Sequence, residues 1–88
     1  MLERPLTIMN KVGLHARPAA LFVQTAARFK DTRVEVIKDG MTRDAKSILS
    51  VLTLGVSQGT TITVRADGPQ AEAALAALAD LVDRDFGE

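Results

Sequence analysis

The spacing of the apolar residues changes repeatedly along this chain of 88 residues, and no other feature limits its fold as strongly. Apolar residues at every second position are typical of strands, and apolar residues three and four positions apart are typical of helices. Four segments have the pattern or composition of strands, namely residues 4–9, 33–38, 41–44 and 60–66. Three others favour helices, namely residues 15–28, 47–54 and a last segment with Pro69 at its first position.

Turn and cap residues support these boundaries. Asp39-Gly40 is a strong signal for a tight hairpin between two strands. Ser47 is suited to cap the start of the middle helix, and Gly55 to end it. The resulting order is βαββαβα, with two strand–helix–strand crossovers around a central hairpin. This order predicts an α+β fold in which helices cover one face of a mainly antiparallel sheet.

The predicted faces follow from the same spacing. We expect Leu6, Ile62, Val64 and Ala66 on the covered face of the sheet. The other face, which meets water, would carry Thr7, Thr61, Thr63 and Arg65. The helical core positions are Ala19, Phe22, Val23 and Ala26 in the first helix and Ala71, Ala74, Leu75, Leu78, Leu81 and Val82 in the last.

Composition excludes several classes of protein. The length indicates one domain, residues 1–88, and without cysteine there are neither disulfides nor thiolate metal sites. Eleven basic and eleven acidic residues cancel, and with three Phe and no Trp or Tyr the chain lacks the basic surface and stacking platforms of a nucleic-acid binder. Neither a secretory signal nor a membrane span is expected. The composition is compatible with the cytoplasm.

The single histidine, His15, stands in Gly13-Leu14-His15-Ala16-Arg17-Pro18, where a helix is predicted to begin. The first backbone N–H groups of a helix have no intrahelical acceptor, and with the helix dipole they attract anions. A neutral ring nitrogen of His15 would be a nucleophile at this helix end. A phosphoryl group placed on it would then be stabilised by the same dipole and by Arg17.

Other roles for these two residues are weaker. His15 could simply cap or pack against the helix. Zinc binding is improbable without a second His, a Cys or spaced carboxylates nearby, and so small a domain has little room for a catalytic triad with its substrate pocket. Arg17 could be a solvated first-turn residue, but a cation at that end opposes the dipole unless an anion arrives. We therefore favour an anion site.

Residues 47–54 carry apolar side chains on all sides. A two-turn helix on a sheet buries only one side, so if Val51 and Leu54 point inward, Ile48, Leu49 and Leu52 stay partly exposed. Either they form a partner surface or neighbouring helices cover them. Leu21, which lies off the first helix's stripe, adds weight to the first alternative. Ser47 is most simply a cap, at a place where an added phosphate is structurally tolerated.

Two stretches resemble one known family. Gly13-Leu14-His15-Ala16-Arg17-Pro18-Ala19-Ala20, with Lys46-Ser47-Ile48-Leu49 and Leu54-Gly55 downstream, is similar to HPr. HPr proteins are the histidine-containing phosphocarriers of the bacterial phosphoenolpyruvate-dependent sugar phosphotransferase system. The resemblance spans essentially the whole chain and implies an open-faced β-sandwich, with three helices on one side of a four-stranded antiparallel sheet.

The resemblance also implies roles for individual residues. His15 would accept a phosphoryl group through Nδ1 from phosphorylated enzyme I and pass it to an enzyme IIA domain, while Arg17 and the amides of Ala16 and Arg17 hold the phosphate. Ser47 matches the family's regulatory serine, the target of HPr kinase/phosphorylase, and a transcriptional regulator is a further expected partner. Partners would dock on Ala20, Leu21, Gln24, Ile48, Leu49 and Leu52. No cofactor or metal is implied, and we expect a cytoplasmic monomer that binds neither nucleic acid nor membrane.

The chain departs from well-known family members at three places. The interval from His15 to Ser47 is one residue longer, most simply within the loop 29–33. Ser50 stands where glycine or lysine is found, and Val12 replaces a small polar residue found in some members. These changes affect partner contacts more than chemistry. The alternatives to a sugar phosphocarrier are a regulatory module acting through Ser47 and a nitrogen-related carrier with the same chemistry. An independent enzyme is the least favoured reading.

Overall fold

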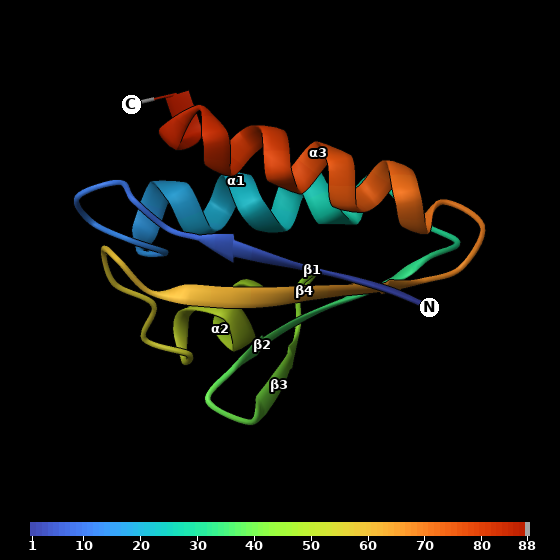
Figure 1. The fold of residues 1–88 in the computed structure, drawn as a ribbon, viewed down its shortest axis with the longest axis horizontal. Coiled ribbons are helices and arrows are strands. Elements are labelled where there is room, and N and C mark those ends of the chain that lie inside the picture. Colours follow the sequence, from blue (N-terminus) through green and yellow to red (C-terminus); the bar gives the residue numbers. More distant parts are fainter. Residues whose placement is uncertain (88) are drawn as a thin grey trace.

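Three helices cover one face of a four-stranded antiparallel sheet in this computed structural model, which describes residues 1–87 (Figure 1). The strands are β1 (Leu2–Thr7), β2 (Arg33–Lys38), β3 (Met41–Asp44) and β4 (Thr61–Asp67). The helices are α1 (Ala16–Ala27), α2 (Ile48–Leu52) and α3 (Ala71–Asp83), and a 3-10 turn, η1 (Asp85–Gly87), follows α3. The predicted element order and the open-faced α+β architecture are confirmed.

The strand order is β1-β4-β2-β3, so β4 lies between two strands, β1 and β2, that precede it in sequence. Leu6 lies opposite Ile62 in the β1–β4 pair, and Val36 opposite Val64 in the β2–β4 pair. The predicted hairpin joins β2 to β3, with Asp39 at φ 51° and Gly40 at φ 78°. Two consecutive left-handed residues match the twist of the flanking strands.

One core lies between the sheet and the helices. It includes Ile62, Val64 and Ala66 of β4, which are fully buried as predicted. Phe22 of α1 and Val51 of α2 belong to the same cluster, which places both helices on the face that α3 covers. Every predicted core position of α3 is buried, and in α1 only Val23 is half-buried. α1 also packs against both α2 and α3.

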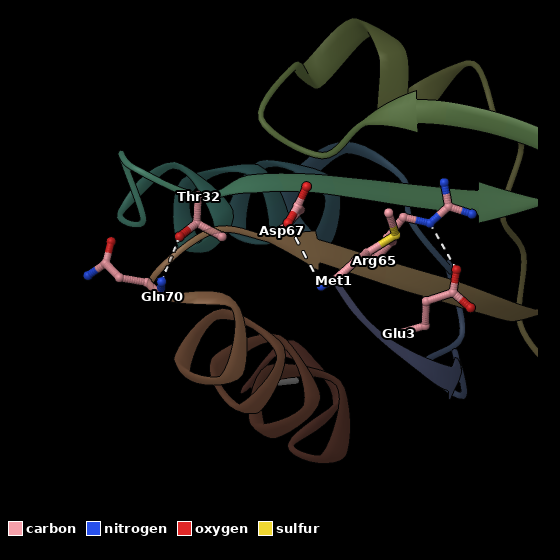
Figure 2. A network of polar contacts seen from close by, with 6 residues as sticks. All are labelled: Met1, Glu3, Thr32, Arg65, Asp67 and Gln70. Atoms are coloured by element: carbon pink, nitrogen blue, oxygen red, sulfur yellow. Dashed lines mark hydrogen bonds and ion pairs between the residues drawn. The ribbon is translucent and has the colours of Figure 1, made fainter.

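The uncovered face of the sheet is polar, as predicted, and ties the edge strand β1 to the centre. Arg65 of β4 contacts Glu3 of β1 at 2.9 Å and Glu35 of β2 at 3.7 Å. Thr7 and Thr61 share a hydrogen bond of 2.9 Å. Figure 2 shows the Arg65–Glu3 pair together with the ion pair between the amino group of Met1 and Asp67 (3.8 Å). Single exposed pairs contribute little, but this row connects three neighbouring strands.

The prediction that Pro69 is the first residue of the last helix is wrong, because α3 begins at Ala71. A long-range contact sets this start. The backbone N–H of Gln70 donates to Oγ1 of the buried Thr32 at 2.9 Å (Figure 2). Gly68 at φ +142° brings the chain so close to Thr32 that a Cβ there would lie 2.8 Å from its Cα. Residues 67–69 therefore belong to the loop that packs against the loop around Thr32, and not to the helix.

Other boundaries differ by a few residues. β1 runs from Leu2 to Thr7 rather than over residues 4–9, because its first residues pair with the end of β4. Met9 lies beyond the strand, in the loop that leads to α1. α1 begins at Ala16, and His15 is its N-cap rather than a residue of the first turn. α2 is shorter than residues 47–54, since only Ile48–Leu52 are helical.

Candidate functional site

The loop between β1 and α1 is fixed before it reaches His15. Leu14 is buried, and its N–H donates to the carbonyl oxygen of Val56 at 3.0 Å. Gly13 adopts φ +63°, and a Cβ on it would collide with that same carbonyl and lie 2.7 Å from Cα of Ser57. Only glycine fits this close approach. The glycine of the motif thus sets where the helix starts.

His15 occupies the N-cap of α1 with extended backbone angles, φ −118° and ψ 169°. Its side chain makes no capping hydrogen bond and is exposed to solvent. Its carbonyl oxygen accepts the N–H of Ala19 at 3.0 Å, which is the first bond of the helix. Pro18 has no N–H, so the amides of Ala16 and Arg17 are the two donors left at this helix end.

The stretch of sequence that forms this helix end is positively charged. The first turn of α1 contains no acidic residue, and the sequence has no Asp or Glu between Arg4 and Lys30. Arg17 is exposed, and within residues 1–87 it belongs to no ion pair. An exposed imidazole, two backbone amides without an intrahelical acceptor and an exposed guanidinium therefore belong to three consecutive residues at this helix end. Such a set can bind a phosphate-sized dianion beside the ring.

Residues 1–87 hold no group of three or more His, Cys, Asp or Glu side chains placed to bind a metal ion. Over the same residues, no helix is long and apolar enough to cross a membrane.

Ser47 forms the N-cap of α2, as predicted. Its Oγ accepts the N–H of Ser50 at 3.3 Å. The neighbouring Lys46 extends its ammonium group away to the loop after α1, where it donates to the carbonyl oxygens of Phe29 and Thr32, both at 2.7 Å. This loop contains the inferred extra residue. Lys46 thereby fixes the chain just before Ser47.

An apolar surface lies across α1 and α2. Val51 and Leu54 point inward and are buried, which leaves Ile48 and Leu49 exposed at 40% and 71%, as predicted. Leu52 is half-buried. The two helices contact each other, and the predicted docking residues of both are at least partly accessible. We call this set the α1–α2 patch, comprising Ala20, Leu21, Gln24, Ile48, Leu49 and Leu52.

Comparison with known proteins identifies the family. Residues 2–84 match the family model described as the PTS HPr component phosphorylation site. The chain belongs to the HPr family. It is 46% identical over 88 residues to an HPr of Xylella fastidiosa and 43% identical to one of Cupriavidus necator, in each case across 100% of this chain and 98% of the relative. The resemblance inferred from the two motifs is confirmed, and the family is that of the phosphocarriers of the phosphotransferase system.

Solved HPr structures support the same assignment. HPr-C-His from Thermoanaerobacter tengcongensis superposes with a TM-score of 0.97 at 50% identity, covering 100% of this chain and 98% of that one. An HPr dimer from the same organism superposes with a TM-score of 0.80 at 50% identity, covering 100% of this chain and 100% of that one. The HPr-like protein Crh of Halalkalibacterium halodurans is 39% identical over 85 residues, 97% of this chain and all of that one.

Three side chains with structural roles near the site were not singled out from the sequence. Asn10 is buried in the loop before Gly13, Lys38 donates to the carbonyl oxygens of Leu54 and Gly55 at 3.0 and 3.1 Å, and Lys46 binds the loop after α1. Their partners lie at other places in the chain, and the residues carry no local pattern. Lys46 does belong to the Lys46-Ser47-Ile48-Leu49 motif, but that motif indicates family membership and does not predict this contact.

Proposed function

We propose that this chain carries phosphoryl groups on Nδ1 of His15, accepting them from phosphorylated enzyme I and passing them to enzyme IIA domains of sugar permeases. The observation that carries the proposal is the exposed N-cap imidazole beside the amides of Ala16 and Arg17. An ordinary N-cap side chain would bond to its own helix, whereas this one leaves both donors and its ring available for a ligand.

The transfer conserves atoms and charge at each step. The lone pair of neutral Nδ1 forms a bond to phosphorus, and the bond between phosphorus and the donor breaks, its electron pair leaving with the donor. In the second transfer the acceptor attacks phosphorus, and the N–P bond breaks to return neutral His15. The phosphoryl group brings about −1.5 to −2 charge, which Arg17, the two amides and the helix dipole stabilise.

The protein acts in this scheme as a macromolecular substrate and not as an independent enzyme. Its own contribution is to hold the phosphoryl group where either partner can reach it, and it needs no cofactor. The α1–α2 patch includes Ala20 and Leu21 in the N-terminal half of α1, so we expect a partner seated on it to reach His15 as well. We expect a monomer that works in the cytoplasm and binds neither nucleic acid nor membrane. A nitrogen-related carrier would use the same chemistry with other partners.

A regulatory role through Ser47 is the second candidate. Its support is the N-cap position of the half-buried Ser47 next to exposed Ile48 and Leu49, together with the similarity to an HPr-like Crh protein. HPr kinase/phosphorylase would add a phosphate to Oγ of Ser47, and a transcriptional regulator would read it. The added charge would also change the edge of the α1–α2 patch and weaken docking of enzyme I.

Phosphorylation assays separate the two candidates. With phosphoenolpyruvate and enzyme I, the wild-type chain should gain one acid-labile phosphate, detected by intact mass. His15→Ala should gain none, while Ser47→Ala serves as the matched control and should be labelled normally. A phosphate retained in His15→Ala would sink the carrier role.

The regulatory role has its own readout. ATP and HPr kinase/phosphorylase should give an acid-stable phosphate that Ser47→Ala loses and His15→Ala keeps. A wild-type chain left unlabelled by an active kinase would remove this role. Size-exclusion chromatography with light scattering, run on the same samples, tests the expected monomer against a dimer.

A further inference from the structure

Asn10 is a buried polar residue in the loop that leads to His15. It is only 5% exposed, whereas its neighbours Met9, Lys11 and Val12 all face solvent. Burying an amide is costly unless hydrogen bonds replace its water. The contacts of this side chain therefore define what the loop requires.

The side chain and backbone of Asn10 hold both polar groups of Gly13. Nδ2 of Asn10 donates to the carbonyl oxygen of Gly13 at 3.0 Å. The N–H of Gly13 donates to the carbonyl oxygen of Asn10 at 3.2 Å, closing a tight turn. The two bonds run in opposite directions between the same residues, so the turn resists rotation of either peptide group.

The next peptide group, between Gly13 and Leu14, is held at both ends. Its oxygen accepts from Asn10, and its N–H donates to the carbonyl oxygen of Val56. This is the peptide immediately before the Leu14–His15 peptide. Rotating it would change the backbone angles of His15 and so reorient its imidazole relative to the amides of Ala16 and Arg17, which belong to helix α1. Asn10 thus acts on the site without touching it.

We propose that Asn10 is a positioning residue for phosphoryl transfer: its amide fixes the Gly13–Leu14 peptide and thereby the placement of His15 beside the helix amides. The proposal rests on the proposed function of His15. Displacements near 1 Å can cost up to about a hundredfold in rate, so loss of one of two anchors should cost about tenfold in kcat. Binding of enzyme I depends on other residues and should not change.

The experiment compares three variants with the wild-type chain. Asn10→Ala removes the donor, and Asn10→Asp keeps the shape but presents a carboxylate, which cannot donate to the Gly13 carbonyl. Gln58→Ala is the matched control, because the exposed Gln58 donates from Nε2 to the carbonyl oxygen of Met9 at 3.1 Å in the same loop. Each protein is assayed for kcat and KM with enzyme I, and its thermal unfolding midpoint is recorded.

A second readout does not depend on any partner. Phosphoramidate phosphorylates histidine directly, and the half-life of phospho-His15 is then followed by phosphorus NMR. With the amides of Ala16 and Arg17 displaced, the phosphoryl group loses stabilising donors, so its half-life should shorten severalfold in both Asn10 variants and stay unchanged in Gln58→Ala.

The outcomes divide cleanly. A tenfold lower kcat with an unchanged KM and a shorter half-life supports the proposal. The proposal is overturned if the unfolding midpoint falls but kcat and the phosphohistidine half-life, measured at temperatures below the midpoint, match those of the wild type. Asn10 would then have a purely structural role. If Asn10→Ala does not fold, Asn10→Asp supplies the same comparison. Failure of wild type to accept phosphate from enzyme I defeats the proposed function, while the phosphoramidate half-lives still decide the role of Asn10.

Discussion

α1 and α2 begin at N-cap residues with the same extended backbone conformation, but only one of these residues caps its helix with its side chain. His15 and Ser47 are both N-caps with extended backbone angles, φ −118° and −113°. Oγ of Ser47 accepts the N–H of Ser50 in its own helix, whereas the side chain of His15 makes no capping hydrogen bond. α2 has five residues and α1 has twelve. A short helix depends on its cap, and a long, well-packed one can leave its first amides to a ligand.

The two ends also differ in what holds them. The start of α1 is fixed from outside by Gly13, Asn10 and the carbonyl of Val56, and not by the side chain of its cap residue. α2 is held at its far end by Lys38 and just before its start by Lys46. Because the side chain of His15 does not cap the helix, its imidazole is available to bind a ligand. The following changes test this contrast, in order of expected effect.

Gly13→Ala should be the most damaging. The new Cβ would have to occupy a left-handed conformation and would collide with Val56, so the free energy of unfolding should fall by about 3 kcal/mol in urea titration. Gly55→Ala is the control. Gly55 has nearly the same φ, +65°, but nothing lies within 4 Å of its Cβ position, so its loss should be about 1 kcal/mol. Equal losses would show that strain alone matters at Gly13.

Arg17→Ala should lower kcat/KM for transfer from enzyme I by about tenfold to a hundredfold. A hydrogen bond to a charged group is worth about 1.5–3 kcal/mol, and this one would form with the transferred phosphoryl group. Steady-state kinetics provide the measurement. Arg28→Ala removes the same charge from the other end of α1 and should leave kcat/KM unchanged. If both variants lose activity alike, the effect is one of general charge and not of position.

Ser47→Ala should cost about 1 kcal/mol of stability through loss of the cap. His15→Ala should change the free energy of unfolding by less than about 0.5 kcal/mol, because that side chain caps nothing. Parallel urea titrations of the two variants measure the difference directly. A larger loss in His15→Ala than in Ser47→Ala would refute the contrast drawn between the two helix starts.

Lys38→Met should lower the free energy of unfolding by about 0.5–1 kcal/mol. Nζ of Lys38 donates to the carbonyl oxygens of Leu54 and Gly55, just beyond the C-terminal end of α2, where a cation also interacts favourably with the helix dipole. Lys30→Met, at an exposed position, is the control and should be neutral in thermal unfolding. A stability for Lys38→Met that matches this control would mean that α2 needs no support at that end.

Local patterns were sufficient for most of the fold. The stripe of α3, the alternation in β4 and the Asp39-Gly40 turn each specify their conformation within a few residues, so they could be predicted. The start of α3 could not, because it depends on the contact between Gln70 and Thr32, 38 positions apart. Phe86 is similar: it is buried at φ 58° in η1, and a lone aromatic near the C-terminus carries no periodic signal.

The same distinction holds for the candidate site. His15, Arg17 and Ser47 lie in contiguous motifs beside predicted helix starts, so their placement at those starts could be foreseen. The anchors of the site could not, since Asn10 and Lys38 are recognised only through the backbone groups they contact. Capping bonds are local, whereas loop anchors are tertiary. The residues proposed to carry the phosphoryl chemistry were therefore easier to find than the residues that anchor the nearby loops.

The polar face of the sheet has a practical consequence. The chain lacks cysteine, and Thr42 of β3 is exposed on that face, on the side away from the helices. Thr42→Cys would provide a unique thiol for a fluorophore or for immobilisation on a sensor chip, with His15 and the α1–α2 patch left open to the solution.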